Sequence, residues 1–452
     1  FYCEKDSRTT GVDVGELTKM LLRIALEDDA WRVRAAALGS LGRPAVARRL
    51  QGSHTATDVA AAAAALLTDE AWQVRRRAAE ALQASGQAAA DHSQVLMEAL
   101  SDPVWQVRQR AASALVASTD SSATHSLITA LRGDDDPRVR EAAASALGRS
   151  QCTESRSSSA WALADSLTAD QNSLVRVAAV EGLSALGSAA LPHAATLARQ
   201  LKGCDASLRS AVRDFFSKAT GPCTAAFSAT FGLDSFTDAA SQAEAAREAR
   251  EALQALSPLA AAVAPHAERF ADELLSQSIQ ARQEAEQGIE ALGTTAVPCM
   301  VERVARARDG DFRARMAAMR GLSCTGVLSH DLACAFLAEW IYQPVVESLP
   351  VSGLELIVLQ TPQEDLGINL QWAVLRGRHG TFRGQCFLVY RGSETILDWT
   401  ENASTSLKGV EVPRWGVLLL HSGFWSSVDG ERDRLHAALV KAAEGVSLEV
   451  LV

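Results

Sequence analysis

The feature that most constrains this chain is a short motif that recurs through its first two-thirds. In each copy an aspartate or a similar polar residue precedes an apolar residue and an arginine, and small residues follow. The first six copies place their arginines at Arg34, Arg75, Arg108, Arg140, Arg176 and Arg209. Degenerate copies at Arg247 and Arg282 and a clearer one at Arg315 bring the total to nine, which span 281 residues in eight steps of about 35. A period of this length predicts a solenoid of stacked units.

Each copy has the residues that one helix of a pair needs. The aspartate is expected to cap the free N–H groups at the helix start, and Val, Ala-Ala and Leu recur at three- and four-residue spacing on one apolar face. The segments between copies, such as 58–67 and 93–100, supply the partner helices. Since one pair cannot bury its apolar face alone, the pairs must stack. The helices are expected to end at glycines, namely Gly42, Gly86, Gly148 and Gly187.

The pattern D-x-x-V-R-x-x-A-A-x-A-L resembles the short HEAT repeats, including the variety found in phycobilin lyases. The resemblance covers residues 15–325 and implies an α-solenoid that binds other proteins. Lyase activity stays open as an alternative, although no motif carries its chemistry and the C-terminal part does not fit it. A helical-repeat metal hydroxylase would show His-Glu pairs, and no histidine here is followed by glutamate. The irregular stretch 222–298 is interpreted as divergent repeats.

Two sets of repeat residues are candidates for specific roles. The arginines are expected to form a structural ladder with acidic residues of adjacent repeats, and they are Arg34, Arg75, Arg108, Arg140 and Arg176. Trp31, Trp72 and Trp105 occupy one repeat position and should line up in space. They form either a packing stripe at the repeat junctions or a contact surface for a partner protein, because tryptophan is enriched at binding hot spots.

The composition argues against several classes of protein. A net charge of −10 disfavours non-specific nucleic-acid binding, which needs a basic face. The eight cysteines are scattered without a C-x-x-C pair, so no metal site or disulfide framework is indicated and reduced thiols in an intracellular compartment are favoured. No apolar run reaches the roughly 18–20 residues of a membrane-spanning helix, so no transmembrane segment is expected. The chain begins at Phe1, so a targeting peptide upstream would not be visible. No cofactor is expected.

The pattern changes near Val327. Residues 330–342 predict a helix with Leu332, Phe336 and Trp340 on one face. A second amphipathic helix is expected over 432–443 and a final strand over 446–452. Further strand-like runs are 354–359, 369–375, 386–390 and 416–420. The predicted fold is therefore mainly α, with a HEAT-repeat solenoid over 15–325 followed by a partial α/β domain over 327–452.

The order of short motifs in this second part resembles the class 3 lipases, which have an α/β-hydrolase fold. R-G-S at 391–393, D-W at 398–399 and H-x-G-F at 421–424 follow one another at plausible spacings. The resemblance implies a lipid ester substrate and an oxyanion hole to which Ser393 contributes. It also implies a lid over 394–404, with the apolar residues Ile396, Leu397 and Trp399.

The nucleophile of such an enzyme is missing from these residues. In the lipase family the last strand leads into a G-x-S-x-G elbow, whereas this sequence stops at Val452 and holds no G-x-S-x-G anywhere. The triad order is Ser, Asp, His, and all three members would follow that point. No catalytic residue can therefore be assigned. We expect either that the protein continues or that another chain covers the edge of the incomplete sheet.

Two functions remain. The first is a protein-binding HEAT scaffold that is a subunit of a larger assembly and carries a lipase-like domain without its nucleophile. The alternative is a serine-dependent lipid acyl-ester hydrolase, provided that the full-length protein continues past residue 452.

Overall fold

The computed structural model describes most of the repeat region and parts of the C-terminal region. The described residues are 14–231, 239–307, 312–327, 333, 336–337, 340–341, 349–360, 372–378, 383, 385–390, 407–412, 416–421, 437, 441 and 449–450. The chain divides into two compact units, residues 1–219 and 220–452. Each unit is described by itself, and the domain limits 15–325 and 327–452 stay a prediction.

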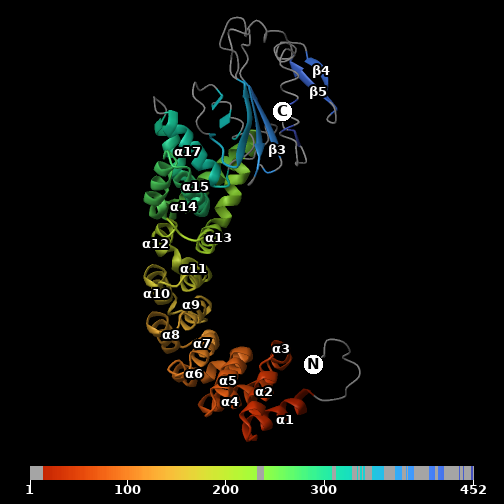
Figure 1. Cartoon of the computed structure of the whole chain (residues 1–452), viewed down its shortest axis with the longest axis vertical. Coiled ribbons are helices and arrows are strands. Elements are labelled where there is room, and N and C mark those ends of the chain that lie inside the picture. Colours follow the sequence, from red (N-terminus) through yellow and green to blue (C-terminus); the bar gives the residue numbers. More distant parts are fainter. Residues whose placement is uncertain are drawn as a thin grey trace. The chain divides into compact units, whose positions relative to one another are not determined.

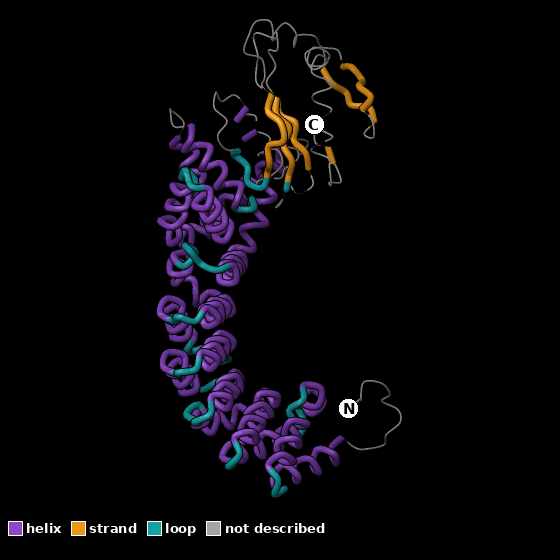
Figure 2. Tube along the Cα trace, in the orientation of Figure 1, coloured by secondary structure: helices purple, strands orange, loops and turns teal. Residues whose placement is uncertain are grey.

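The first unit is a series of stacked helices (Figures 1 and 2). They are α1 (Val14–Glu27), α2 (Trp31–Leu41), α3 (Pro44–Leu50), α4 (His54–Ala65), α5 (Trp72–Ser85), α6 (Ser93–Ala99), α7 (Trp105–Ala114), α8 (Ser121–Gly133), α9 (Pro137–Arg149), α10 (Arg156–Ala169), α11 (Ser173–Leu186), α12 (Ala194–Arg199) and the start of α13 (Ala206–Phe231). Short 3-10 turns join some of them, namely η1 (Leu66–Thr68), η2 (Gly86–His92), η3 (Leu115–Ala117) and η4 (Gly187–His193).

These helices form two layers. The first layer holds α4, α6, α8, α10 and α12, and the second layer holds α2, α5, α7, α9 and α11, each of which contacts the next (Figure 1). The second layer carries the V-R motif of the first five copies. The motif valines Val74, Val107, Val139 and Val175 are fully buried, as the apolar face predicted, whereas Val33 of the first copy is 40% exposed. Alanines fill the contacts between neighbouring helices, which allows close approach.

A polar residue of each copy was expected to cap its helix, and Asp136 and Asn172 do cap α9 and α11. In the first three copies the aspartate lies before the N-cap residue and does not cap the helix itself. The Asp69 carboxylate accepts a hydrogen bond from the Ala71 N–H at 2.9 Å, and Asp102 accepts one from the Val104 N–H at 2.8 Å. Ala71 and Val104 are the N-cap residues of α5 and α7, and neither makes a side-chain cap. The aspartate therefore shapes the turn that precedes the helix. Its carboxylate oxygens can still accept hydrogen bonds from a side chain of the preceding repeat.

The arginine of the preceding repeat donates these hydrogen bonds to the aspartate carboxylate. Arg108 Nε and Nη2 donate to the two Asp134 carboxylate oxygens at 2.7 and 2.8 Å, while Arg108 Nη1 donates to the Asp102 carbonyl at 2.9 Å. One guanidinium thus ties together the turns of two successive repeats. The aspartate side chains in these pairs are only 6–8% exposed. The four pairs are Arg34–Asp69, Arg75–Asp102, Arg108–Asp134 and Arg140–Asp170.

In the pairs of Arg108 and Arg140, the charged form of the arginine is favoured by its aspartate partner. The hydrogen bond to Asp134 raises the pKa of Arg108, and the hydrogen bond to Asp170 raises the pKa of Arg140. Burial opposes ionisation of Asp170, but hydrogen bonds from Arg140 and from the Asn172 N–H outweigh it and hold its pKa below the usual value. Each junction is therefore a charge-assisted, two-pronged hydrogen bond.

Arg176 departs from the expected ladder. Its Nη1 donates to the carbonyls of Asp170 and Gln171 at 3.1 and 2.9 Å, but no carboxylate of the described residues forms an ion pair with it. The reason is visible in the sequence, because Gly203 stands where the next copy should have its aspartate, six residues before Arg209. Within the described residues the Arg–Asp ladder therefore has four members.

Gly148 was predicted to end a helix, and α9 ends one residue later, at Arg149. Gly148 lies inside α9, is buried, and faces Gly182 of α11, so that a β-carbon on Gly148 would stand 2.3 Å from the Gly182 α-carbon. Its missing side chain permits a helix–helix contact. Gly42, Gly86 and Gly187 do follow the ends of α2, α5 and α11, and Gly86 and Gly187 adopt positive φ of 57° and 62°.

One described stretch, Ser173–Arg199, is long and apolar enough to span a membrane by length and composition, which the sequence analysis did not expect. It is not one continuous α-helix here. α11 ends at Leu186, Gly187 turns the chain, and η4 and α12 follow. Val175, Val180 and Leu183 are fully buried in the stack, so the apolar composition of this stretch serves repeat packing.

The helices of the second unit depart from the repeat. They are the end of α13, α14 (Ala239–Glu273), α15 (Ile279–Leu292), the turn η5 (Gly293–Ala296), α16 (Val297–Arg306) and α17 (Phe312–Cys324). The copy predicted at Arg247 lies inside α14, a single 35-residue helix, so it does not begin a helix. Arg282 keeps a repeat-like bond, because its Nη1 donates to the carbonyl of Ser276 six residues earlier at 2.6 Å.

The strands of this unit include the four predicted runs. β1 (Leu354–Gln360), β2 (Trp372–Gly377) and β3 (Gln385–Tyr390) pair antiparallel, and β6 (Glu449–Val450) pairs parallel with β3. β4 (Leu407–Val412), which was not predicted, pairs antiparallel with β5 (Gly416–His421). Among the described strands, β3 and β6 form the parallel pair. Phe336 and Trp340 of the predicted 330–342 helix are helical and buried.

The Gly148–Gly182 contact can be tested with one methyl group. Gly148→Ala should lower the free energy of unfolding by about 1–3 kcal/mol, because the added carbon meets backbone atoms that cannot yield. Gly133→Ala is the matched control, since a β-carbon there meets open space. Urea unfolding followed by circular dichroism compares the two. Equal stability of both variants would show that α9 and α11 can separate without cost.

The ladder can be tested by replacing one of its arginines with lysine, which keeps the positive charge but removes the paired N–H donors of the guanidinium group. Arg108→Lys should lose about 2–3 kcal/mol, since an ammonium cannot bind the Asp134 carboxylate and the preceding turn together. Arg176→Lys should lose clearly less, because Arg176 has carbonyl partners alone. Urea unfolding of both variants gives the comparison, and the opposite ranking would refute the bridging role of the carboxylate.

Candidate partner-binding surface

The tryptophans named by the sequence share one place in the repeat. Trp31, Trp72 and Trp105 are the first residues of α2, α5 and α7, and all three are half-buried. The corresponding first residues of α9 and α11 are Pro137 and Ser173, so the row stops after three members. Their role in binding a partner stays a prediction.

One of these tryptophans is covered by the next repeat. The Arg138 guanidinium lies 3.4 Å from the ring centroid of Trp105, a cation–π contact. Arg138 is also held by Asp136, whose carboxylate accepts from its Nε and Nη2 at 3.0 and 2.8 Å. Trp105 therefore takes part in the junction between α7 and α9, which favours the packing role for this member of the row.

A more exposed tryptophan lies in the first layer. Trp161 of α10 is 56% exposed, with the Arg132 guanidinium of α8 at 4.7 Å from its ring. Arg132 also forms an ion pair with Asp165 at 3.4 Å. The sequence analysis missed Trp161 because it stands outside the repeated motif. A single ring held by one arginine offers a small contact area, so Trp161 is a weaker candidate for partner binding than a cluster of several residues.

The second layer carries a cluster of arginines that the sequence analysis also missed. Arg76 and Arg77 of α5 and Arg110 of α7 surround the Glu80 carboxylate, at 3.9, 2.6 and 3.1 Å respectively. The three side chains are 32%, 42% and 42% exposed, whereas Glu80 is 18% exposed. One carboxylate thus faces three cations. We call these four residues the arginine cluster.

The helical periodicity explains why these residues gather. The ladder arginines Arg75 and Arg108 point along the stack into the junctions, so the residue two positions later in each helix faces outward. That residue is Arg77 in α5 and Arg110 in α7. Arg77 reaches back over α2, where a β-carbon on Gly39 would stand 3.6 Å from its Nε. The cluster therefore extends over three successive helices of the second layer. The runs R-R-R at 75–77 and R-Q-R at 108–110 were the available signal.

The residues that the lipase resemblance singled out lie outside the described residues. They are Ser393, Ile396, Leu397 and Trp399. No group of three or more potential metal ligands occurs in the described parts of the chain. Four cysteines there carry free thiols, and burial raises the pKa of Cys299 to about 11 and that of Cys324 to about 12. Neither thiol is therefore suited to act as a nucleophile at neutral pH.

Comparisons with known proteins agree with the helix pairs of the first unit. The HEAT-repeat family matches residues 18–116, 59–148, 93–184 and 124–213. No curated protein matches the sequence.

Several solved structures are similar to the chain at low identity. An engineered protein is 17% identical with a TM-score of 0.35, and the match covers 74% of this chain and 95% of that one. Importin beta is 16% identical with a TM-score of 0.43, covering 73% and 47%. The complex of CpcE and CpcF of phycocyanin lyase from a Nostoc species is 18% identical with a TM-score of 0.33, covering 72% and 99%. Scores this low carry no inference about function.

The family match and the repeated geometry coincide over the first unit. The motif, the two layers and the Arg–Asp ladder all fall within the matched residues. Over residues 18–213 this chain therefore matches the HEAT-repeat family and has the stacked helix pairs of a HEAT-repeat solenoid.

Proposed function

We propose that this chain is a protein-binding HEAT scaffold, a subunit of a larger assembly, and that it holds an acidic segment of its partner at the arginine cluster. The observation that carries the proposal is the imbalance of charge there, three arginines around Glu80. Two of these arginines are more than 40% exposed, so they can reach a ligand in solution. The surface belongs to the repeat layer that the ladder holds rigid.

The chemistry of the cluster selects carboxylates. Glu80 already occupies one place between Arg77 and Arg110, at distances of 2.6 and 3.1 Å, and so shows how a carboxylate fits there. Guanidinium groups bind carboxylates through paired N–H donors. The net charge of the chain, −10, disfavours a long polyanion such as nucleic acid, which would meet repulsion beyond the cluster. A short acidic stretch of a protein fits both constraints.

The proposal predicts a charge-specific loss of binding. A fluorescent octaglutamate peptide should bind the chain at low salt, and the triple substitution Arg76→Glu, Arg77→Glu and Arg110→Glu should weaken binding at least about tenfold, because attraction becomes repulsion. Fluorescence anisotropy measures both affinities. A rise in ionic strength should weaken binding to the unmodified chain.

A control variant with three other Arg→Glu substitutions has the same change in net charge. It distinguishes the effect of charge at the arginine cluster from the effect of the total charge of the chain. Arg132→Glu, Arg156→Glu and Arg199→Glu alter exposed first-layer residues in α8, α10 and α12. This variant should keep most of the affinity. If both triples lose it equally, the peptide responds to total charge alone and the arginine cluster is not the site.

We propose as a second candidate that the strand region belongs to a lipase-like ester hydrolase in the full-length protein. The observation that favours it is the strand order β1–β2–β3–β6. β3 pairs parallel with β6, with Gln385 opposite Glu449 and Cys386 opposite Val450. A parallel neighbour that returns after a long crossover is the arrangement required of the strand that precedes the nucleophile elbow.

This second candidate depends on the residues encoded after Val452. It predicts a G-x-S-x-G elbow within about ten residues of that point. The full-length protein should then hydrolyse short acyl p-nitrophenyl esters, and replacing the elbow serine by alanine should abolish the activity. A downstream sequence without the elbow removes the hydrolase from consideration and leaves the scaffold proposal intact.

A further inference from the structure

The first repeat carries an extra helix. The interval from Arg34 to Arg75 is 41 residues, whereas the next intervals are 33 to Arg108 and 32 to Arg140. α3, Pro44–Leu50, lies in the longer interval between α2 and α4. Insertions into a repeat are frequent at the binding face of a solenoid, because the stack itself does not need them. An extra helix such as α3 is therefore a candidate binding element.

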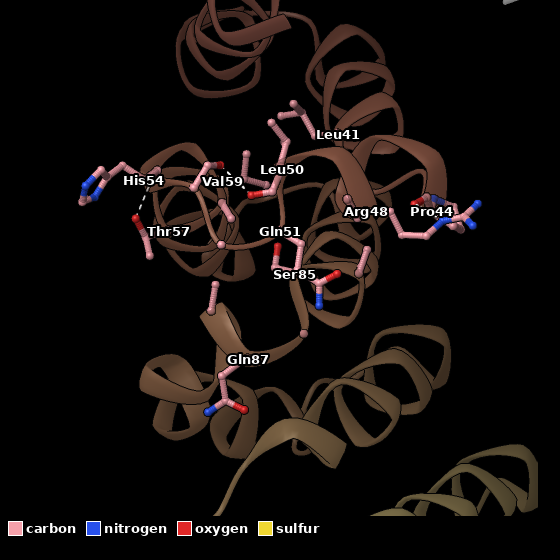
Figure 3. Close-up of a pocket in the computed structure, with 17 residues that line it drawn as sticks. Leu41, Pro44, Arg48, Leu50, Gln51, His54, Thr57, Val59, Ser85 and Gln87 are labelled. Atoms are coloured by element: carbon pink, nitrogen blue, oxygen red, sulfur yellow. Dashed lines mark hydrogen bonds between the residues drawn. The ribbon is translucent and has the colours of Figure 1, made fainter.

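α3 forms one wall of a pocket of about 590 Å³. The other walls are the end of α2, the start of α4 and the end of α5 with η2. Its floor is apolar, because Leu41, Leu50, Ala56 and Val59 are all less than 10% exposed and pack together. Figure 3 shows Leu41, Leu50 and Val59 on one side of the pocket and Gln87 on the other. A bulky apolar side chain would be removed from water there, and each such burial is worth roughly 1.5–3 kcal/mol.

One arginine, Arg48, lines this pocket, and Arg43 and Arg49 stand on the same segment of the chain without lining it. Arg43, Arg48 and Arg49 are all exposed, and none of them forms an ion pair with another described residue. Figure 3 shows Arg48 directed outward beside Pro44. None of the residues that line the pocket is acidic. An apolar floor beside positive charges without ion-pair partners fits a ligand that has an apolar group with negatively charged groups next to it.

We propose that this α3 pocket binds a bulky apolar side chain of a peptide segment whose neighbouring residues are acidic. The three arginines extend from Arg43 to Arg49, about 9 Å along the helix axis at 1.5 Å per residue. One carboxylate cannot meet charges spread over that length, so a peptide with several acidic residues fits better than a small acid. The proposal shares with the proposed function the premise of a protein partner, but it uses none of the residues of the arginine cluster.

The test uses a labelled peptide in which Leu-Phe is flanked on each side by three glutamates, with binding measured by fluorescence anisotropy on the full chain. Two altered peptides separate the contributions. Replacing Leu-Phe by Ser-Ser should weaken binding at least tenfold, and replacing the glutamates by glutamines should do the same. If the Ser-Ser peptide binds as well as the parent, the pocket floor makes no contribution and the proposal is overturned.

Substitutions within α3 locate the site. Ala47 lines the pocket, whereas Ala45 is exposed on the same helix and does not line it. Ala47→Trp should fill the pocket and reduce affinity at least tenfold, and Ala45→Trp should leave it within twofold. Arg48→Glu with Arg49→Glu should also reduce it, when compared in a chain that already carries the triple substitution of the arginine cluster so that binding of the glutamates there is removed. Equal binding by Ala47→Trp and Ala45→Trp would place the peptide elsewhere.

Two competing occupants would also overturn the proposal. If laurate binds with the same dependence on Ala47 and the peptides do not bind, the pocket takes a small amphiphile. If the peptide binds only after residues 1–13 are removed, that segment of the chain is the occupant. The peptide comparison needs no variant, so it stands even if Ala47→Trp fails to fold, which circular dichroism would reveal.

Discussion

The fold of the first unit depends on one guanidinium group per repeat. Each ladder arginine is bound on one side to the backbone of its own turn and on the other to an aspartate that shapes the next turn. The apolar stack supplies most of the favourable free energy, because burial of alanine, valine and leucine side chains is extensive. That burial is weakly directional. The arginine fork fixes the register of one repeat on the next, because its donors have a planar and rigid geometry.

This division of roles leaves the outward positions of the second layer available for binding. The residues one and two positions after each ladder arginine are not members of the Arg–Asp ladder, so their identity can vary from copy to copy. They are arginines in α5, but Glu141 and Ala142 in α9. The chemical character of the surface therefore changes along the stack while the scaffold stays the same. The arginine cluster is one surface of this kind, and the inserted helix α3 with its arginines is another.

Much of the architecture could be predicted from sequence because it is periodic. The repeated motif predicted the helix pairs, and alternating apolar runs predicted β1, β2, β3 and β5. Features that arise between elements could not be predicted in this way. Gly148 resembles a helix terminator in one dimension, and the contact with Gly182 exists only once α9 and α11 are neighbours. The copy at Arg247 matched the pattern weakly, but the surrounding alanine- and glutamate-rich sequence favours one continuous helix.

The candidate sites were less predictable than the fold. The tryptophan row was visible in sequence, whereas the arginine cluster requires Glu80, Arg77 and Arg110 to meet from two helices. The α3 pocket is a cavity, which no pattern reports. The α3 helix also indicates how such chains can evolve new binding sites. Because each repeat is coupled to its immediate neighbours alone, an extra helix at one junction disturbs no distant part of the stack. A solenoid can therefore acquire a new binding site by a local insertion, without a change in the rest of its fold.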